Sequence, residues 1–249
     1  MKVVATYNIK GGVGKTSAAV NVAALGAESG LRTLLWDLDP QGSASYLFRV
    51  KPKVKGGGRK LVRGRSEIVD LLRGSDVEGL DLLPADFSYR HMDLALVEAG
   101  KPTERLAKVL APIEQHYDLA VLDCPPSISL VTESVFEVTD LLLVPLIPST
   151  LTMRTYEQLD GFVSGDQVAR PPSVLAFFSM VDRRKRLHRQ VVESFPRDRD
   201  DVARTAIPAA TEVELMGVRR RPVVVDTPDS RAGRAYRGLW GEVRERVGL

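Results

Sequence analysis

Glycines and cations near the start of the chain have the spacing of a phosphate-binding loop. Residues 7–17 read YNIKGGVGKTS. Gly11, Gly12 and Gly14 let the backbone adopt conformations forbidden to other residues, so successive N–H groups can turn inward around an anion. A helix expected to begin near Lys15 adds the positive end of its dipole at the same place. These residues therefore predict a site for the phosphates of a nucleotide.

Two further side chains of the loop predict how a nucleotide would be held. Lys15 is expected along the β- and γ-phosphates, and the hydroxyl of Thr16 on Mg²⁺. The usual pattern, G-x-x-x-x-G-K-[ST], also requires a glycine five residues before Gly14, where this chain has Ile9. Lys10 adds a cation that the pattern does not require. The loop has either lost part of its function or gained another.

Acidic residues at the ends of two apolar runs could complete a site for a metal-bound triphosphate. Asp37 and Asp39 follow one run, and alternation along an extended chain would direct both to the same side. Asp123 ends a second run, as the acid that orients Mg²⁺ does in phosphate-loop proteins. Each acid alone could be a helix cap or a surface charge. Their shared position at strand ends, after a phosphate loop, favours a nucleotide site.

Strands must alternate with helices to bring these residues together. Apolar runs bounded by turn residues predict strands over Val3–Tyr7, Thr33–Trp36, Leu80–Leu83, Leu119–Leu122, Leu141–Leu146, Val174–Met180 and Val223–Val225. Helical periodicity lies between most of them, over Thr16–Ser29, Leu130–Val138, Tyr156–Val163 and Tyr236–Val247. The alternation predicts an α/β fold with a single doubly wound, mostly parallel sheet flanked by helices. Ligands are expected at the carboxyl ends of its strands.

Length and composition fit a single domain over residues 1–249. The chain is 44% hydrophobic and 27% charged, which argues against disorder over most of its length. No apolar run approaches the roughly 20 residues needed to cross a bilayer, and the chain opens on a strand-like segment without a signal peptide. A cytoplasmic location is therefore expected. One cysteine, Cys124, excludes an intrachain disulfide, and the three histidines lack the spacing of metal ligands.

The segment KGGVGKT, Lys10–Thr16, resembles the deviant Walker A motif of the ParA/MinD group of P-loop ATPases. In that group the lysine at the position of Lys10 is the signature residue, and many ParA proteins lack the distal glycine. The resemblance implies that Lys10 reaches across a dimer interface to the nucleotide of the partner subunit. ATP carries about four negative charges, and a buried cation from a second chain would neutralise them only in the dimer.

The resemblance extends over nearly the whole chain. It covers Asp37–Ser45, Gly79–Ala85, Asp123–Ser127, Phe178–Arg184, Ile207–Pro208 and Pro222–Tyr236. It implies a fold of the P-loop NTPase type. It also implies that Lys10 and Lys15 act in catalysis with Asp39, which would orient the attacking water.

The same resemblance implies the ligand contacts. The metal would be held by Thr16, Asp37 and Asp123. The nucleotide would be held by Lys10, Gly11, Gly12, Val13, Gly14, Lys15, Thr16, Ser17, Met180 and Pro208. The last two would lie near adenine, although packing in the core explains them equally well.

Basic residues gather in three parts of the sequence. Residues 49–65 carry eight lysines and arginines and no acid, which predicts a solvated, mobile loop or a contact with DNA phosphates. Two further clusters would form a DNA surface if they converge across a dimer, and otherwise a solvated helix face balanced by nearby acids. Their members are Arg183, Arg184, Lys185, Arg186, Arg189, Arg219, Arg220 and Arg221. No segment resembles a base-reading helix-turn-helix domain, so non-specific binding is expected.

The resemblance implies an enzyme that hydrolyses ATP slowly until a partner protein stimulates it. ATP and Mg²⁺ would be its cofactors, ATP would pair two subunits into a homodimer, and the dimer would bind nucleoid DNA non-specifically. A ParB-like adaptor on a chromosome, a plasmid or a protein assembly would then trigger hydrolysis and release.

Three other classes remain as alternatives. A MinD-like ATPase at the membrane surface requires a terminal amphipathic helix, whereas Tyr236–Val247 has the pattern of a core-facing helix, so no membrane partner is expected. An electron-transfer protein of the nitrogenase iron-protein kind would need two cysteines per chain. A DNA-binding module without enzymatic activity would not require the set Lys15, Thr16, Asp39 and Asp123.

Overall fold

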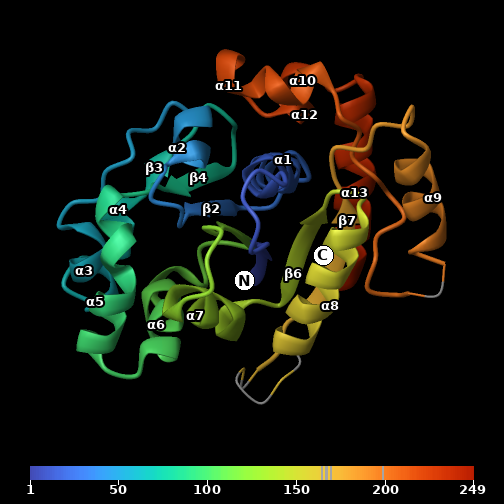
Figure 1. Ribbon diagram of the computed structural model, residues 1–249. Helices are drawn as coiled ribbons and strands as arrows, with labels where there is room; N and C mark the ends of the chain where they lie inside the picture. The colour runs from blue at the N-terminus through green and yellow to red at the C-terminus, as the bar shows by residue number, and fades with distance from the viewer. Residues whose placement is uncertain (164, 166–167, 169, 198) are drawn as a thin grey trace.

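The centre of the computed structural model is a seven-stranded sheet with helices on both faces (Figure 1). The structure describes residues 1–163, 165, 168, 170–197 and 199–249. The strand order is β3-β4-β2-β5-β1-β6-β7. All pairs are parallel except β3 with β4, at one edge. This arrangement confirms the predicted α/β fold with one mostly parallel sheet.

Strands of the sheet are short and, except for the exposed edge strand β3, mostly buried. They are β1 (Lys2–Thr6), β2 (Thr33–Asp37), β3 (Arg73–Gly74), β4 (Leu80–Leu83), β5 (Leu119–Asp123), β6 (Leu141–Leu146) and β7 (Ser173–Phe178). Parallel strands buried on both faces have continuous apolar sequences, which is why these segments could be recognised. Because β1 lies between β5 and β6, the loop that follows it lies near the middle of the sheet's carboxyl edge.

Helices fill most connections between the strands and also make up much of the chain after β7. They are α1 (Lys15–Glu28), α2 (Ser43–Leu47), α3 (Gly57–Val62), α4 (Ile68–Leu71), α5 (Met92–Ala99), α6 (Arg105–Leu110), α7 (Leu130–Val138), α8 (Thr150–Val163), α9 (Arg186–Ser194), α10 (Thr211–Glu214), α11 (Met216–Arg219), α12 (Val223–Asp226) and α13 (Arg231–Val247). Three 3₁₀ turns add η1 (Phe87–His91), η2 (Pro102–Glu104) and η3 (Ala111–Ile113). The longest helix, α13, begins where the hydroxyl of Ser230 accepts the N–H of Gly233 at 3.0 Å, and it ends at Gly248 with φ 70°.

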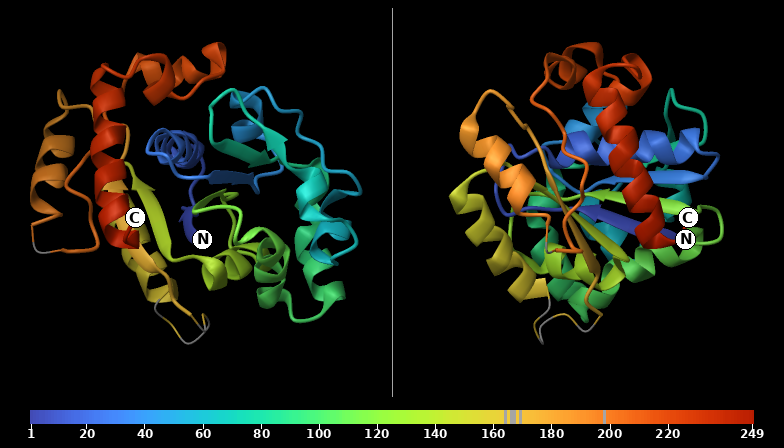
Figure 2. Two further views of the ribbon diagram at one scale, coloured as in Figure 1. Left: turned by 180° about the vertical axis from the view of Figure 1, so that it is seen from behind. Right: turned by 90° about the vertical axis from the view of Figure 1, so that its right-hand side faces the viewer.

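Two apolar clusters cover the two faces of the sheet (Figures 1 and 2). One packs α1, α12 and α13 against alternate strand residues such as Val4 and Leu35. The other packs α5, α7 and α8 against the residues between them, such as Ala5 and Trp36. The sheet is therefore buried on both faces, and its carboxyl edge is where polar side chains can gather.

One predicted strand is wrong. Val223–Val225 begins the short helix α12, in which the N–H of Asp226 bonds to the main-chain oxygen of Pro222 at 3.0 Å. The N–H of Val224 also donates to Oδ1 of Asn21 in α1, at 3.1 Å. Burial of two valines against α1 stabilises a helix here, although β-branched residues favour strands when no such packing exists.

Residues 49–65 contain structure that the sequence did not indicate. Helix α3 forms within the segment, starting at Gly56, whose φ of 89° only glycine adopts readily. Its residues Leu61 and Val62 are buried in the core, as is Val54 just before it. Mobility of this segment stays a prediction. Within the described part of the chain, no helix combines the length and the apolar character that crossing a bilayer requires.

Candidate functional site

The loop between β1 and α1 wraps around the ammonium group of its own lysine. Lys15 is 7% exposed, and its Nζ donates a hydrogen bond to the main-chain oxygen of Lys10 at 3.0 Å. Asn8 is buried and braces the start of the loop. Its Nδ2 donates to the oxygen of Pro145 at 2.8 Å, and its Oδ1 accepts the N–H of Lys10 at 2.9 Å. These bonds hold the loop in place without the distal glycine of the usual pattern.

The glycines of the loop differ in their surroundings: Gly11 and Gly12 face open space, whereas Gly14 is closely packed. Gly14 has φ 99°, and a Cβ built there would lie 2.7 Å from Oγ of Ser179. Gly12 has φ 71°, yet a Cβ on it or on Gly11 would meet no atom within 4 Å. Open space in front of glycine N–H groups is what an anion requires in order to approach the backbone.

Strands β2 and β5 end side by side, each in a buried aspartate. Asp37 and Asp123 are register partners, and both are 0% exposed. Oδ2 of Asp37 accepts two hydrogen bonds from Ser45, from its N–H and its hydroxyl, both at 2.7 Å. Oδ1 of Asp123 accepts a longer bond, 3.4 Å, from Oγ1 of Thr6. The other oxygen of each carboxylate is buried without a hydrogen-bond partner among the described residues.

Burial governs the electrostatics of this cluster. It raises the pKa of Asp37 although two hydrogen bonds oppose the change. Burial, followed by the charge of Asp37, raises the pKa of Asp123 well above its usual value, and the positive charge of Lys15 opposes this change. Burial also lowers the pKa of Lys15, while Asp123 opposes this. A divalent cation would reduce the repulsion between the carboxylates and would coordinate their unpaired oxygens. The residues therefore fit Mg²⁺, which binds through one or two carboxylates and phosphate oxygens.

Asp39 and Lys10 lie outside this buried cluster. Asp39 is half-buried, and its Oδ1 accepts the N–H of Gln41 at 2.9 Å. The side chain of Lys10 is exposed and makes no hydrogen bond or ion pair with the residues that the structure describes. The two lysines of one loop thus face different environments, one inside the subunit and one in solvent.

The two residues predicted near adenine lie together beside the phosphate loop. The segment after β7 pairs with the one before α10, because the N–H of Val181 donates to the oxygen of Ile207 at 3.0 Å. Met180 is 38% exposed and has φ 55°, whereas Pro208 is buried. Ser179, which touches the loop at Gly14, directly precedes Met180. This position is compatible with adenine contacts, which stay a prediction.

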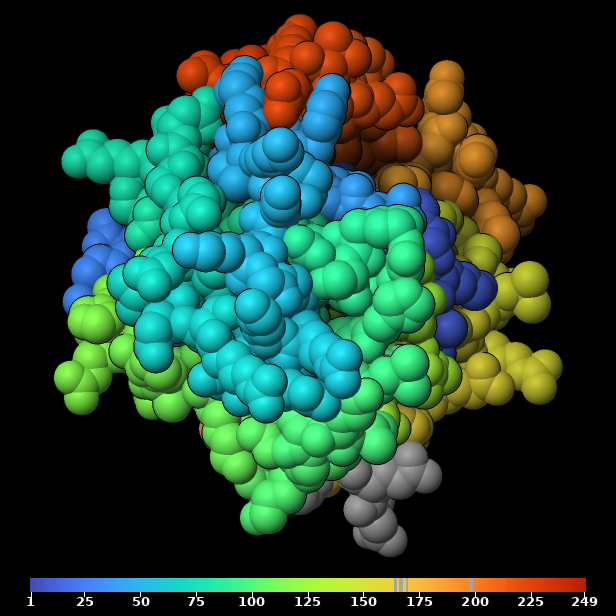
Figure 3. Space-filling view, turned by 90° about the vertical axis from the view of Figure 1, so that its left-hand side faces the viewer, coloured from blue at the N-terminus to red at the C-terminus, as the bar shows by residue number. Residues whose placement is uncertain are grey.

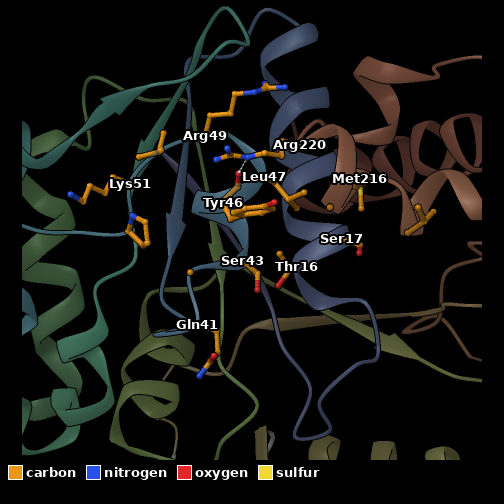
Figure 4. A pocket seen from close by; sticks show the side chains of 15 residues that line it. Thr16, Ser17, Gln41, Ser43, Tyr46, Leu47, Arg49, Lys51, Met216 and Arg220 are labelled. Atoms are coloured by element: carbon orange, nitrogen blue, oxygen red, sulfur yellow. Dashed lines mark hydrogen bonds between the residues drawn. The ribbon is translucent and has the colours of Figure 1, made fainter.

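A cavity of about 690 Å³ adjoins the first turn of α1 (Figure 4). Thr16 and Ser17 form its floor near the phosphate loop. One wall comes from α2 and the residues after it, and includes Tyr46. The other wall comes from α10 and α11, and includes Met216. The cavity therefore connects the nucleotide loop with two helical segments far apart in the sequence.

Two arginines join the walls of this cavity and are called the arginine clasp below. Nη2 of Arg49 donates to the oxygen of Arg219, and Nε of Arg220 donates to the oxygen of Tyr46, both at 2.9 Å. The guanidinium of Arg220 also lies 4.4 Å from the ring centroid of Tyr46 (Figure 4). Arg49 and Arg220 both have left-handed backbone, at φ 60° and 53°. This conformation costs roughly 1–3 kcal/mol per residue, which the clasp and its surroundings must offset.

The residues predicted to bind DNA fall on two separate elements. Five lie at and just before the start of α9, on the right of Figure 1, and three lie at the end of α11 and just after it, at the top. The exposed members without a side-chain bond to the described protein are Arg183, Lys185 and Arg186. Binding of DNA by these residues stays a prediction.

The other five predicted DNA contacts are bonded within the subunit. Arg184 pairs with Asp182 at 3.0 Å, and Arg189 donates to main-chain oxygens. Arg219 pairs with an aspartate of α12, Arg220 belongs to the clasp, and Arg221 lies 3.7 Å from Asp76. These arginines help to hold the fold together, which the sequence pattern did not reveal.

Comparison with known proteins decides the family. A protein family described as an AAA domain matches residues 1–167. The sporulation initiation inhibitor protein Soj of Bacillus subtilis is 31% identical over 247 residues, covering 97% of this chain and 98% of that protein. The chain belongs to the ParA family of P-loop ATPases. The resemblance drawn from the motifs of this ParA-family chain is thereby confirmed.

Two further comparisons extend this result. The chromosome partitioning protein ParA of Myxococcus xanthus is 31% identical over 196 residues, covering 77% of this ParA-family chain and 69% of that protein. A solved structure of cobyrinic acid a,c-diamide synthase from Mycobacterium smegmatis is 26% identical, with TM-score 0.82, covering 100% of this chain and 97% of that one. That structure contains an ATP analogue and magnesium. The predicted pair of cofactors, ATP and Mg²⁺, is therefore confirmed at the level of the family.

Sequence analysis missed the residues that support the site. Asn8 braces the loop, Ser45 holds Asp37, and Ser179 packs behind Gly14. The only signal for Asn8 was its position beside the missing glycine, and for Ser45 its place in the segment that follows Asp37. Polar residues of these types are common in loops, so their roles become visible only when their partners are known.

Proposed function

We propose that this ParA-family ATPase forms a dimer when it binds ATP, and that the dimer binds DNA without reading its sequence. The observation that carries the proposal is the opposite placement of the two loop lysines. Lys15 is buried and bonded within the subunit, whereas the side chain of Lys10 is exposed and makes no ion pair in the part of the chain that the structure describes. A cation that one subunit does not use is available for the triphosphate held by a second copy.

Each subunit would supply its own set of groups for ATP hydrolysis. Lys15 and the loop N–H groups would bind the β- and γ-phosphates, and Thr16, Asp37 and Asp123 would hold the metal. Mg²⁺ supplies charge neutralisation at the β- and γ-phosphates when it is bound. Asp39, which is less buried than the other two acids, would accept a hydrogen bond from the attacking water and orient it. Turnover would be slow until a partner protein completes the site.

The cargo is inferred from relatives. The names of two of them, a chromosome partitioning protein and a sporulation initiation inhibitor, support a role in positioning or segregation. We therefore place this chain on nucleoid DNA, with a ParB-like adaptor that links it to a chromosome, a plasmid or a protein assembly and stimulates hydrolysis. Dimerisation and DNA binding would both follow the ATP state, so hydrolysis would act as a timer.

Substitution of Lys10 tests the proposal. Lys10→Ala should still bind ATP, because its own subunit holds the nucleotide through Lys15. It should remain a monomer with a non-hydrolysable ATP analogue and should lose ATP-dependent DNA binding, since the interfacial cation is gone. Light scattering after gel filtration measures the first effect, and duplex DNA binding with ATP, ADP or no nucleotide across a salt series measures the second.

A matched control is Lys2→Ala, which removes another exposed lysine, at the opposite end of β1. It should dimerise and bind DNA like the wild type. Lys15→Ala should fail earlier, by losing nucleotide affinity itself. If Lys10→Ala forms the ATP-dependent dimer and binds DNA with wild-type salt dependence, the proposed pairing through Lys10 is wrong.

A further inference from the structure

Unpaired positive charge lies on the opposite side of the molecule from α9. Segment 49–65 crosses the face shown in Figure 3, in blue to cyan, and α9 lies on the other side in Figure 1. The arginines of the segment are mostly paired: Arg59 and Arg63 with Glu98, at 2.9 and 2.7 Å, and Arg49 with an aspartate. Its lysines are not. The exposed lysines that make no ion pair within the described chain, called the lysine face below, are Lys51, Lys53, Lys55 and Lys60.

The lysine face is fixed against the 3₁₀ turn η1. The N–H of Val54 donates to Oδ2 of Asp86 at 2.8 Å, and the N–H of Gly58 donates to Oγ of Ser88 at 2.9 Å. Asp86 also accepts the N–H of Ser88 at 2.9 Å, which caps the turn. These bonds lie on both sides of Phe87 in the sequence. The turn that carries Phe87 is therefore held beside the backbone that carries the lysines.

Phe87 presents an aromatic ring to solvent at this place. Its side chain is 63% exposed. The guanidinium of Arg90 lies 3.8 Å from the ring centroid and so adds a cation to one face of the ring. The exposed ring therefore stands on a turn that is bonded to the segment with the unpaired lysines. Rings and cations together bind single-stranded nucleic acid, since the ring stacks on a base and the cations bind phosphates.

We propose that the lysine face, with Phe87 and Arg90, is a binding site for single-stranded nucleic acid. It is distinct from the duplex-binding arginines of the proposed function, and it requires neither the dimer nor the nucleotide. Most of those arginines are bonded within the subunit, whereas the lysine face can release counterions on binding without first breaking an ion pair. Residues 49–65 contain no acid, and the carboxylates of Asp76 and Glu98 beside the segment are paired with its arginines, which reduces their repulsion of phosphates.

Fluorescence anisotropy with a labelled oligothymidylate of about 16 nucleotides tests the site, with the full chain and without nucleotide. Replacing the four lysines by glutamine should weaken binding. It should also reduce the slope of log K against log salt by about 0.7 for each phosphate that the lysines no longer neutralise. Phe87→Ala should weaken binding about 5- to 150-fold, the range for one base stacked on an aromatic ring. Phe87→Trp should retain affinity because the stacking surface is kept.

The matched control replaces Arg183, Lys185 and Arg186 by glutamine, which removes exposed charge on the α9 side. This variant should leave oligothymidylate binding unchanged. Loss of duplex binding in the same variant would concern the proposed function alone, because these residues belong to its DNA surface. The same measurement with a labelled oligouridylate shows whether the site prefers RNA or DNA. Binding of either oligonucleotide that depends on the four lysines supports the site. Unchanged affinity and salt slope in the four-lysine variant would overturn the proposal. Binding of phosphatidylglycerol vesicles in place of either oligonucleotide would overturn it as well, and would assign this face to a membrane surface.

Discussion

At the scale of single residues, the site contains two adjacent buried carboxylates, and a bound cation would reduce the repulsion between them. Asp37 and Asp123 are adjacent and fully buried, and each keeps one oxygen without a partner among the described residues. Removing a charged oxygen from water without a hydrogen bond is unfavourable, so the free subunit is destabilised at this point. Binding of Mg²⁺ with ATP would remove that penalty. Ligand binding and stability should therefore be strongly linked.

Ser45 tests how much of this arrangement depends on one hydroxyl. Its Oγ donates to Asp37 at 2.7 Å and accepts the N–H of Ala85 at 3.0 Å. The side chains of Ser45 and Asp37 are both buried. Ser45→Ala leaves the Ala85 N–H unpaired and takes one donor from the carboxylate. We expect a loss of about 1–3 kcal/mol in the free energy of unfolding, measured by urea denaturation. The loss should be largest without nucleotide, when no metal at the other oxygen of Asp37 offsets the charge of the carboxylate.

Ser43→Ala is the control for this prediction, because Ser43 is exposed in the same short helix and its side chain makes no hydrogen bond among the residues that the structure describes. Its effect should stay within about 0.5 kcal/mol, as is usual for surface substitutions. Equal effects of the two substitutions would show that Ser45 does not support Asp37. Asp37 could be predicted from its place at a strand end. The hydroxyl that holds it could not, because a single serine in the short helix α2 has no distinctive sequence pattern.

At the scale of elements, the edge of the sheet at β7 is held by one polar cluster. Asp201 accepts two hydrogen bonds from Arg199, at 2.9 and 2.7 Å, and a third from the hydroxyl of Tyr156 in α8. The main-chain oxygen of Asp201 accepts the N–H of Ala176 in β7, at 2.7 Å. The guanidinium of Arg199 also lies 4.9 Å from the ring centroid of Phe195. The cluster thus links α8 and β7 with the segment that returns from α9.

This cluster predicts an acid-sensitive contribution to stability. The hydrogen bonds from Arg199 lower the pKa of Asp201 below its unfolded value of about 3.9, so its stabilisation is complete above that pH and is lost as pH falls through the folded pKa. We expect Asp201→Asn to cost about 1–2 kcal/mol at pH 7, because the group is partly exposed and screened. The difference from the wild type in urea unfolding should shrink toward pH 3. A difference that is independent of pH would exclude the charge of Asp201 as its cause.

Elements could be predicted where one physical signal dominated. The buried parallel strands have continuous apolar sequences, and α13 has an apolar stripe that includes Tyr236 and Trp240, both buried. Val223–Val225 was misassigned because a run of three valines favours a strand, whereas packing on α1 and the hydrogen bond from Val224 to Asn21 favour a turn of helix. Helix α3 was missed because Gly56–Gly58 reads as a flexible linker until its contacts with Ser88 are known.

At the scale of the whole molecule, the fold places two basic surfaces on opposite sides of one loop. The nucleotide loop lies near the middle of the sheet's carboxyl edge, with α9 on one side and the lysine face on the other. The motifs predicted the loop and its acids, because phosphate and metal chemistry requires particular residue types at strand ends. They did not predict which arginines are bonded within the subunit. Arg220, for example, joins α11 to α2 through Tyr46, and no local pattern identifies a partner so distant in sequence.

Substitution of Asp39 should stop the proposed cycle of ATP binding, DNA binding, hydrolysis and release at the hydrolysis step. Asp39→Ala keeps Lys10, Lys15, Thr16, Asp37 and Asp123, so ATP binding, pairing and DNA binding should persist. Hydrolysis should fall by about 10²–10⁴-fold, the usual contribution of a group that accepts a proton from the attacking water. The variant should therefore remain on DNA as an ATP-bound dimer, which single-turnover hydrolysis and the dissociation rate from immobilised duplex DNA would measure. Asp200→Ala, which removes an exposed acid outside the site, should cycle like the wild type. Release of Asp39→Ala from DNA at the wild-type rate, with rapid turnover, would mean that water is oriented by another group and that Asp39 only holds the turn before α2.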